Sequence, residues 1–100
     1  MVIHIIMLKL HEFADGADKQ TNAARVRELL MNMRGRIDGL TRLDVGLNVP
    51  PDPQAWDVSL YTEFVDWPSL EAYRTHPLHL VAVDYIRKVR SERAVVDYEL

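Results

Sequence analysis

The feature that most constrains the fold is the N-terminal run 2–10, which is apolar at both odd and even positions. Its β-branched and aliphatic side chains predict a strand. One parity carries Val2, His4, Ile6 and Leu8, and the other carries Ile3, Ile5 and Met7. Successive side chains of a strand point to opposite faces, so this strand must be buried on both sides. The fold therefore needs an apolar layer above and below it.

A helix is predicted after this strand. Apolar residues recur there at helical spacing, with arginine and glutamate at the intervening positions. Thr21 or Asn22 is the expected N-cap, because short polar side chains accept hydrogen bonds from the free N–H groups of a first turn. Gly35 or Gly39 is the expected end, because glycine adopts the left-handed conformation that terminates many helices.

Two strands and a loop are predicted next. Apolar and polar residues alternate over residues 40–47 and again over 56–64, which is typical of half-buried strands. The proline-rich segment 48–53 lies between them and lacks donor N–H groups. We expect it to form a long surface connection between antiparallel strands.

The C-terminal part predicts two helices and a closing strand. Asp66 is the expected N-cap of a short helix with Pro68 in its first turn. Pro77 begins a second, strongly apolar helix that reaches Val89. Residues 94–100 predict the last strand.

The resulting order is β-α-β-β-α-β, the ferredoxin-like arrangement. This α+β fold packs a four-stranded antiparallel sheet against helices on one face. We expect residues 1–100 to form one domain. The other face of the first strand then has no cover within the chain. A second copy packed sheet on sheet supplies one, giving a homodimeric α/β barrel. A monomer with an exposed apolar sheet face is the alternative.

Net charge and composition limit the classes of partner that this chain can bind. The net charge of -3 provides no attraction to nucleic acid or anionic lipid. A basic cluster is interpreted as the solvated end of a helix rather than a nucleic-acid patch: Arg87, Lys88, Arg90 and Arg93. The chain has no cysteine and no apolar run long enough for a membrane span. We expect a cytoplasmic protein with no nucleic-acid or membrane partner.

Histidine and tyrosine side chains are the candidates for chemistry. His4 shares the parity of an apolar layer, and His79 lies one turn into the apolar helix. Tyr73 and His76 precede that helix, so these side chains can converge at one end of the space between sheet and helices. Imidazole titrates near neutral pH, which suits general acid–base work. Each residue also has a structural interpretation: His4 and Tyr73 as core residues, and His76 as a helix cap.

No metal and no cofactor is expected. The pair His76-x-x-His79 has a helical spacing but no evident third ligand. A glycine-rich phosphate loop, a G-x-S-x-G nucleophile motif and a His-Glu-x-x-His motif are all absent.

Four segments together resemble the stress-responsive dimeric A/B barrel (Dabb) family: 3–10, 37–40, 73–79 and 93–98. The resemblance runs nearly end to end. Its most specific part is the His-Pro-x-His element at 76–79, followed by an apolar helix. The resemblance implies the same dimeric barrel, while most bacterial members of the family have no assigned activity.

The resemblance also implies roles for particular residues. A plant member closes a linear polyketide by aldol condensation, and its catalytic tyrosine and histidine correspond to Tyr73 and His79. Its strand histidine corresponds to His4. Two further pocket positions of that member, a tyrosine and a histidine, hold Leu30 and Val58 here. With His76, these two are the expected ligand-binding residues.

Two kinds of function remain open from the sequence. The first is acid–base chemistry of the cyclase or aldol type on a small hydrophobic molecule, with His79 as base, Tyr73 polarising or protonating a carbonyl oxygen and His4 orienting. The second is a noncatalytic stress-associated or ligand-binding protein. A cofactor-free monooxygenase of the wider dimeric barrel superfamily is a related alternative.

Overall fold

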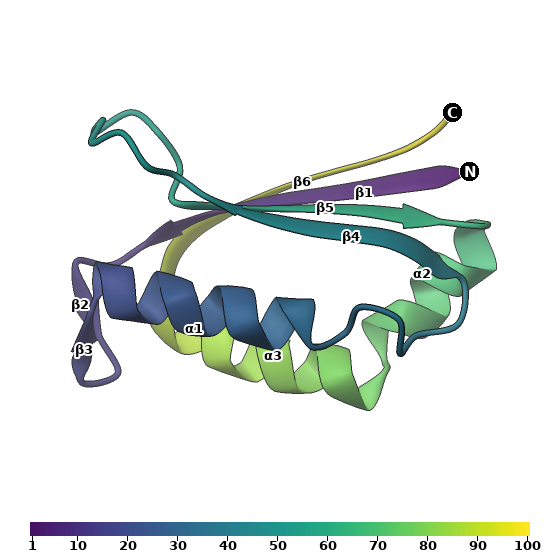
Figure 1. The fold of residues 1–100 in the computed structure, drawn as a ribbon, viewed down its shortest axis with the longest axis horizontal. Helices are drawn as coiled ribbons and strands as arrows, with labels where there is room; N and C mark the ends of the chain where they lie inside the picture. Colours follow the sequence, from purple (N-terminus) through teal and green to yellow (C-terminus); the bar gives the residue numbers. More distant parts are fainter.

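The computed structural model describes all of residues 1–100 and has two layers, a curved sheet above and helices below (Figure 1). The elements in chain order are β1 (Val2–Leu10), β2 (Phe13–Ala14), β3 (Ala17–Asp18), α1 (Lys19–Met31), β4 (Leu40–Leu47), β5 (Val58–Phe64), α2 (Trp67–Arg74), α3 (Pro77–Val89) and β6 (Arg90–Glu99). β2 and β3 form a separate small hairpin that the sequence did not predict.

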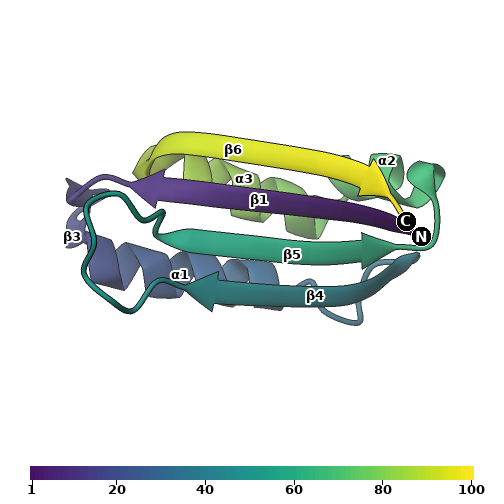
Figure 2. The same ribbon diagram turned by 90° about the horizontal axis from the view of Figure 1, so that it is seen from above.

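The main sheet has the strand order β4-β5-β1-β6, and every neighbouring pair is antiparallel (Figure 2). β1 lies inside the sheet between β5 and β6, as its apolar content requires. All three helices cover the same face of the sheet (Figure 1). The predicted ferredoxin-like α+β fold is confirmed.

The predicted ends of the first helix are wrong. Its N-cap is Asp18, whose Oδ1 accepts from the N–H of Thr21 at 2.8 Å. Asn22 is instead fully buried, and its amide donates to the carbonyl of Ala14 at 2.9 Å. The helix ends at Met31, and turns continue the chain toward β4. Asp18 is the N-cap instead of Asn22 because the buried amide of Asn22 bonds the β2–β3 hairpin.

The later elements follow the prediction more closely. β4 has the expected bounds, and Asp66 caps α2 by accepting from the N–H of Ser69 at 2.9 Å. β5 begins at Val58 rather than at residue 56. β6 begins at Arg90 rather than at residue 94, so α3 passes into it with no intervening loop.

The helices cover one face of the main sheet and leave the other face open to solvent (Figure 1). The hydrophobic core lies between the sheet and the helices and includes Leu8, Phe64 and Leu70. On the outer face, Ile3 is fully buried beside its cross-strand neighbour Tyr98, whereas Met7 is 39% exposed. The outer face therefore keeps apolar side chains open to solvent in the single chain.

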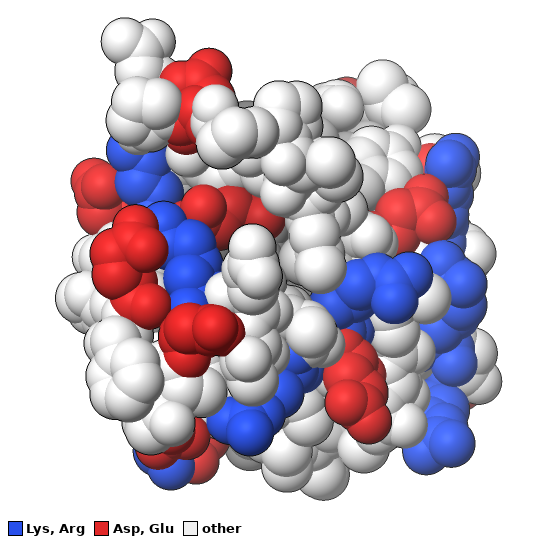
Figure 3. Space-filling view, turned by 60° about the vertical axis from the view of Figure 1, so that its left-hand side comes forward, with Lys and Arg blue, Asp and Glu red and all other residues white.

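Charge is mixed on the face that Figure 3 presents, where acidic and basic side chains are interspersed and the upper part is mostly uncharged. No helix combines the length and the apolar content that crossing a membrane requires.

Candidate functional site

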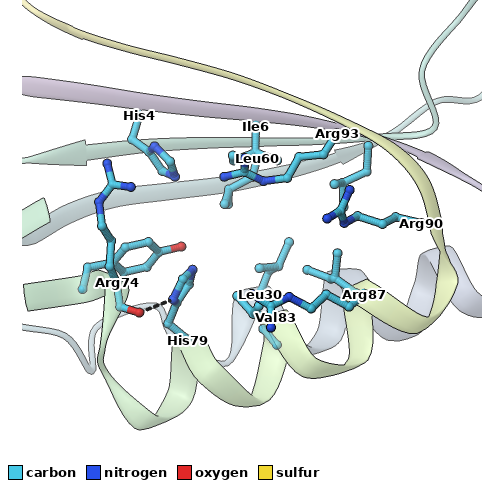
Figure 4. A pocket seen from close by; sticks show the side chains of 14 residues that line it. His4, Ile6, Leu30, Leu60, Arg74, His79, Val83, Arg87, Arg90 and Arg93 are labelled. Atoms are coloured by element: carbon cyan, nitrogen blue, oxygen red, sulfur yellow. Dashed lines mark hydrogen bonds between the residues drawn. The ribbon is translucent and has the colours of Figure 1, made fainter. Parts of the chain in front are cut away.

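A cavity of about 360 Å³ lies between the sheet and the helices (Figure 4). The sheet contributes His4, Ile6 and Leu60, while α1 contributes Leu30. α2 and α3 supply further side chains, among them Tyr73 and His79. Eight of the 14 lining residues are hydrophobic, and the others are histidines and arginines. The cavity is therefore mainly apolar, with a small number of polar side chains.

The structure brings four of the six sequence-predicted site residues to this cavity, namely His4, Leu30, Tyr73 and His79. His76 does not reach it. Its Nδ1 accepts from the N–H of Leu78 at 3.1 Å, so the ring caps α3.

Val58 does not line the cavity either. It pairs with Leu8 and Leu47 on the two adjacent strands and is buried in the core. The structure therefore places both predicted ligand-binding residues outside this cavity: the His76 ring caps α3, and the Val58 side chain packs in the core.

His4 is held by Asp97, a residue that the sequence did not single out. Nδ1 of His4 lies 2.5 Å from Oδ1 of Asp97, on the neighbouring strand β6. Because the carboxylate accepts, Nδ1 carries the proton and Nε2 is left with its lone pair. Burial lowers the pKa of His4, and the contact with Asp97 opposes that shift. His4 is thus a neutral imidazole of fixed tautomer near neutral pH.

His79 has the same tautomer for a different reason. The break between α2 and α3 places the carbonyl of Arg74 3.0 Å from Nδ1 of His79, in the first turn of α3 (Figure 4). A carbonyl oxygen only accepts, so Nδ1 again donates and Nε2 is unprotonated. Burial also lowers the pKa of His79. Both histidines therefore retain a basic nitrogen that the protein does not use.

Tyr73 lies between the two imidazoles. Its ring centroid is 4.3 Å from that of His79 and 5.9 Å from that of His4. The side chain is buried, and its hydroxyl is the only buried side-chain oxygen or nitrogen without a hydrogen-bond partner. Burial raises the pKa of the phenol, so it stays protonated at neutral pH and can donate. Buried polar atoms are nearly always bonded, so this hydroxyl is a donor still available to an acceptor that enters the cavity.

Arginines are the second group that sequence reasoning missed. Arg74, Arg87, Arg90 and Arg93 all line the cavity. Arg74 bonds Oδ2 of Asp97 at 3.3 Å, so one carboxylate orients both His4 and Arg74. Exposure agrees with the interpretation of this cluster as a solvated helix end, because Arg87 and Arg93 are exposed and Arg90 is half-buried. The sequence did not predict that these three side chains also line the cavity.

The site has the parts for proton transfer at a carbonyl compound. Two neutral imidazoles can accept a proton, and one phenol can donate a hydrogen bond to a developing oxyanion. No group of three or more acidic or histidine side chains converges in a way that would hold a metal ion.

Comparison with known proteins identifies relatives of this fold. The chain matches the family model described as the stress responsive A/B barrel domain (Dabb) over residues 2–100. A dimeric protein of unknown function with a ferredoxin-like fold, from Bacteroides fragilis, is 29% identical with a TM-score of 0.84, over 99% of this chain and 95% of that chain. The search of curated proteins found no match.

Two further solved structures are similar in fold alone. A dimeric ferredoxin-like protein of unknown function from Thermobifida fusca has a TM-score of 0.84 at 19% identity, covering 99% of this chain and 90% of that chain. A hydroxynitrile lyase from Passiflora edulis has a TM-score of 0.78 at 11% identity, covering 99% and 92%.

Proposed function

The chain belongs to the stress responsive A/B barrel domain family, and we propose that it is a homodimeric protein whose cavity performs acid–base chemistry of the cyclase or aldol type on a small hydrophobic molecule. A hydroxynitrile lyase of the same fold indicates that this scaffold accommodates an enzyme.

One observation supports the chemistry most directly. In a single cavity, His4 and His79 both have Nδ1 engaged while Tyr73 has a hydroxyl with no partner. This pairs a basic nitrogen with an unused donor beside it, which is what proton removal next to a carbonyl requires.

The proposed roles follow from the contacts. His79 removes a proton from the carbon next to a carbonyl group, through Nε2. Tyr73 donates to the carbonyl oxygen as negative charge develops there, which lowers the barrier to the enolate. His4, held by Asp97, orients the substrate from the sheet side. The enolate carbon then attacks a second carbonyl carbon of the same molecule, and the new alkoxide takes up the proton that His79 had removed, which restores the neutral imidazole.

Turnover of polyketide-like and aromatic ketones by the purified protein tests this proposal. We expect His79→Gln and Tyr73→Phe each to lower kcat by about 100-fold or more, the range for loss of a general acid–base group, while both variants stay folded. His11→Gln is the matched control, because His11 is exposed and lies outside the cavity. Equal turnover by the wild type and both variants across the panel would refute the roles, and saturable binding without turnover would favour the noncatalytic alternative.

The homodimer is proposed from the outer face of the sheet. Apolar side chains from β1 and β6 share this face, because Ile3 pairs with Tyr98 and Ile5 with Val96. Val96 is 51% exposed in the single chain. A second copy packed sheet on sheet would bury this surface, and the similar Bacteroides fragilis and Thermobifida fusca proteins are described as dimeric.

Light scattering tests the dimer. At micromolar concentration we expect twice the 11.6 kDa mass of the chain. Ile5→Lys should give a monomer, because the interface would have to desolvate a charge that has no partner. Leu80→Lys places the same charge on an exposed site of α3 and should leave the dimer intact. A stable monomer of the unchanged chain would refute the proposal.

A further inference from the structure

The two ends of the cavity carry different polar groups (Figure 4). His4, His79 and Arg74 lie at one end and Arg87 and Arg90 at the other, while the side chain of Arg93 extends from the sheet toward the middle. No aspartate or glutamate lines the cavity. Cationic charge is therefore gathered in a concave place that offers no carboxylate to balance it.

These three arginines have no protein partner. Arg87, Arg90 and Arg93 form no ion pair and no side-chain hydrogen bond. Their neighbours do: Arg74 pairs with Asp97 at 3.3 Å, and Lys88 pairs with Asp84 at 3.9 Å. Arg87 and Arg93 are exposed and Arg90 is half-buried, so solvent reaches these groups. What distinguishes them from other unpaired arginines is that all three line one cavity, in a chain whose acidic residues outnumber its basic ones, 15 to 12.

The backbone makes the convergence possible. Arg93 lies opposite Leu8 on the adjacent strand and so shares the helix-facing side of the sheet. A register shift between Lys9 and Leu10 puts Arg90 opposite Leu10. On α3, His79, Val83 and Arg87 follow at four-residue intervals and so share one face of the helix. One helical stripe thus carries the proposed base at its start and a guanidinium at its end.

The dimensions constrain what fits. His79 and Arg87 are eight residues apart on α3, which is about 12 Å along the helix axis at ~1.5 Å per residue. Apolar side chains line the space between the two ends, among them Ile6, Leu30 and Val83. A molecule that spans the cavity would have an apolar body of this length or less, with different polar groups at its ends.

We propose that Arg87, Arg90 and Arg93 bind an anionic oxygen group, a carboxylate or a phosphate ester, on a small molecule whose apolar body fills the cavity. Guanidinium presents paired N–H donors that match both groups. A partly enclosed site strengthens this attraction relative to open solvent. The placement of the molecule's carbonyl group beside His79 rests on the proposed function, whereas the binding of the anion does not.

Calorimetric titration with three probes tests the inference: 3-phenylpropanoate, its neutral amide and phenyl phosphate. We expect at least one of the two anions to bind about 10-fold or more tightly than the amide, the difference for hydrogen bonds to a charged group. The anion that binds more tightly identifies the source, carboxylate or phosphate. Arg90→Gln and Arg93→Gln should each weaken that anion by about 10-fold and leave the amide unchanged.

Arg27→Gln is the matched control, because Arg27 is exposed on α1, lies outside the cavity and has no ion-pair partner. Its affinity for the anions should equal that of the wild type. The inference is overturned if the amide binds as tightly as both anions, if neither anion binds at millimolar concentration, or if Arg27→Gln weakens binding as much as the cavity variants do.

The same titration separates this inference from the proposed function. Anion binding that depends on Arg90 and Arg93 and persists in His79→Gln supports the anion site even where no ketone is turned over. If turnover depends on His79 but the neutral amide binds as tightly as both anions, the result would support the proposed chemistry and overturn the anion site.

Discussion

Replacing Tyr73 by phenylalanine should stabilise the fold, although it removes a polar group from the centre of the candidate site. The hydroxyl has less than 1 Å² of accessible surface and no hydrogen-bond partner. In the unfolded chain the same hydroxyl is hydrated. In the folded chain no protein group replaces those bonds to water.

The size of the effect follows from that loss. A buried polar group left without a partner costs about 1–3 kcal/mol. Phenylalanine keeps the ring and its edge contact with Phe64, whose centroid lies 5.1 Å away. We expect a gain of about 1 kcal/mol or more in the free energy of unfolding, which corresponds to a rise in Tm of about 4–8 °C for a domain of this size.

Tyr85→Phe provides a matched control of opposite sign. The hydroxyl of Tyr85 donates to Oδ1 of Asn22 at 2.8 Å, and Asn22 is fully buried. Removing this donor leaves the amide oxygen without that bond, so we expect a loss of about 1–3 kcal/mol. The two variants make the same chemical change, and only the local bonding differs.

Thermal and urea unfolding of the three proteins checks the pair of predictions. All measurements need the same protomer concentration, because the stability of a homodimer depends on it. If Tyr73→Phe lowers Tm as much as Tyr85→Phe does, the Tyr73 hydroxyl is bonded in the unliganded protein. The idea that it is held free for a ligand would then be refuted.

Three further predictions follow from other contacts. Burial lowers the pKa of His4 and of His79 below the ordinary 6.5, so the unfolded chain binds more protons than the folded chain in acid. Tm should therefore be highest above pH 6.5 and should fall as the pH drops below that value. The fall in Tm should be less steep in His4→Gln. Asp97→Asn keeps an acceptor oxygen but removes the charge that raises the pKa of His4, so an NMR titration should give that ring a still lower pKa. In urea unfolding, Gly39→Ala should lower the free energy of unfolding more than Gly35→Ala does. Both glycines have a left-handed φ, which costs alanine an extra ~1–2 kcal/mol, but only at Gly39 would the new Cβ lie 2.5 Å from Cβ of Ser69. Equal losses in the two variants would contradict this reasoning.

Local sequence pattern was enough for the elements whose signal lies within a few residues. The two-sided apolar run of β1 required a strand inside a sheet, and its neighbours in sequence gave the ferredoxin-like order. Asp66 was identified as a cap because a cap and its helix are adjacent in the chain. The N-cap of α1 was harder to predict, because more than one nearby residue has a suitable side chain. Asn22 matches the preferred residue types as well as Asp18 does, and only the burial of Asn22 against the β2–β3 hairpin distinguishes them.

The candidate site was only partly visible in the sequence. The sequence by itself determined that His4 faces an apolar layer, because strand parity is a local property, and that His79 lies on an apolar helix. Tertiary structure alone decided that Asp97, 93 residues away, holds His4, because that contact depends on the register between β1 and β6. It also decided that Arg90 and Arg93 line the same cavity, because α3 passes directly into β6 and the register shift between Lys9 and Leu10 puts two residues three apart on the same side of the sheet. Side chains far apart in sequence meet only through strand register and helix placement, and no local pattern encodes either.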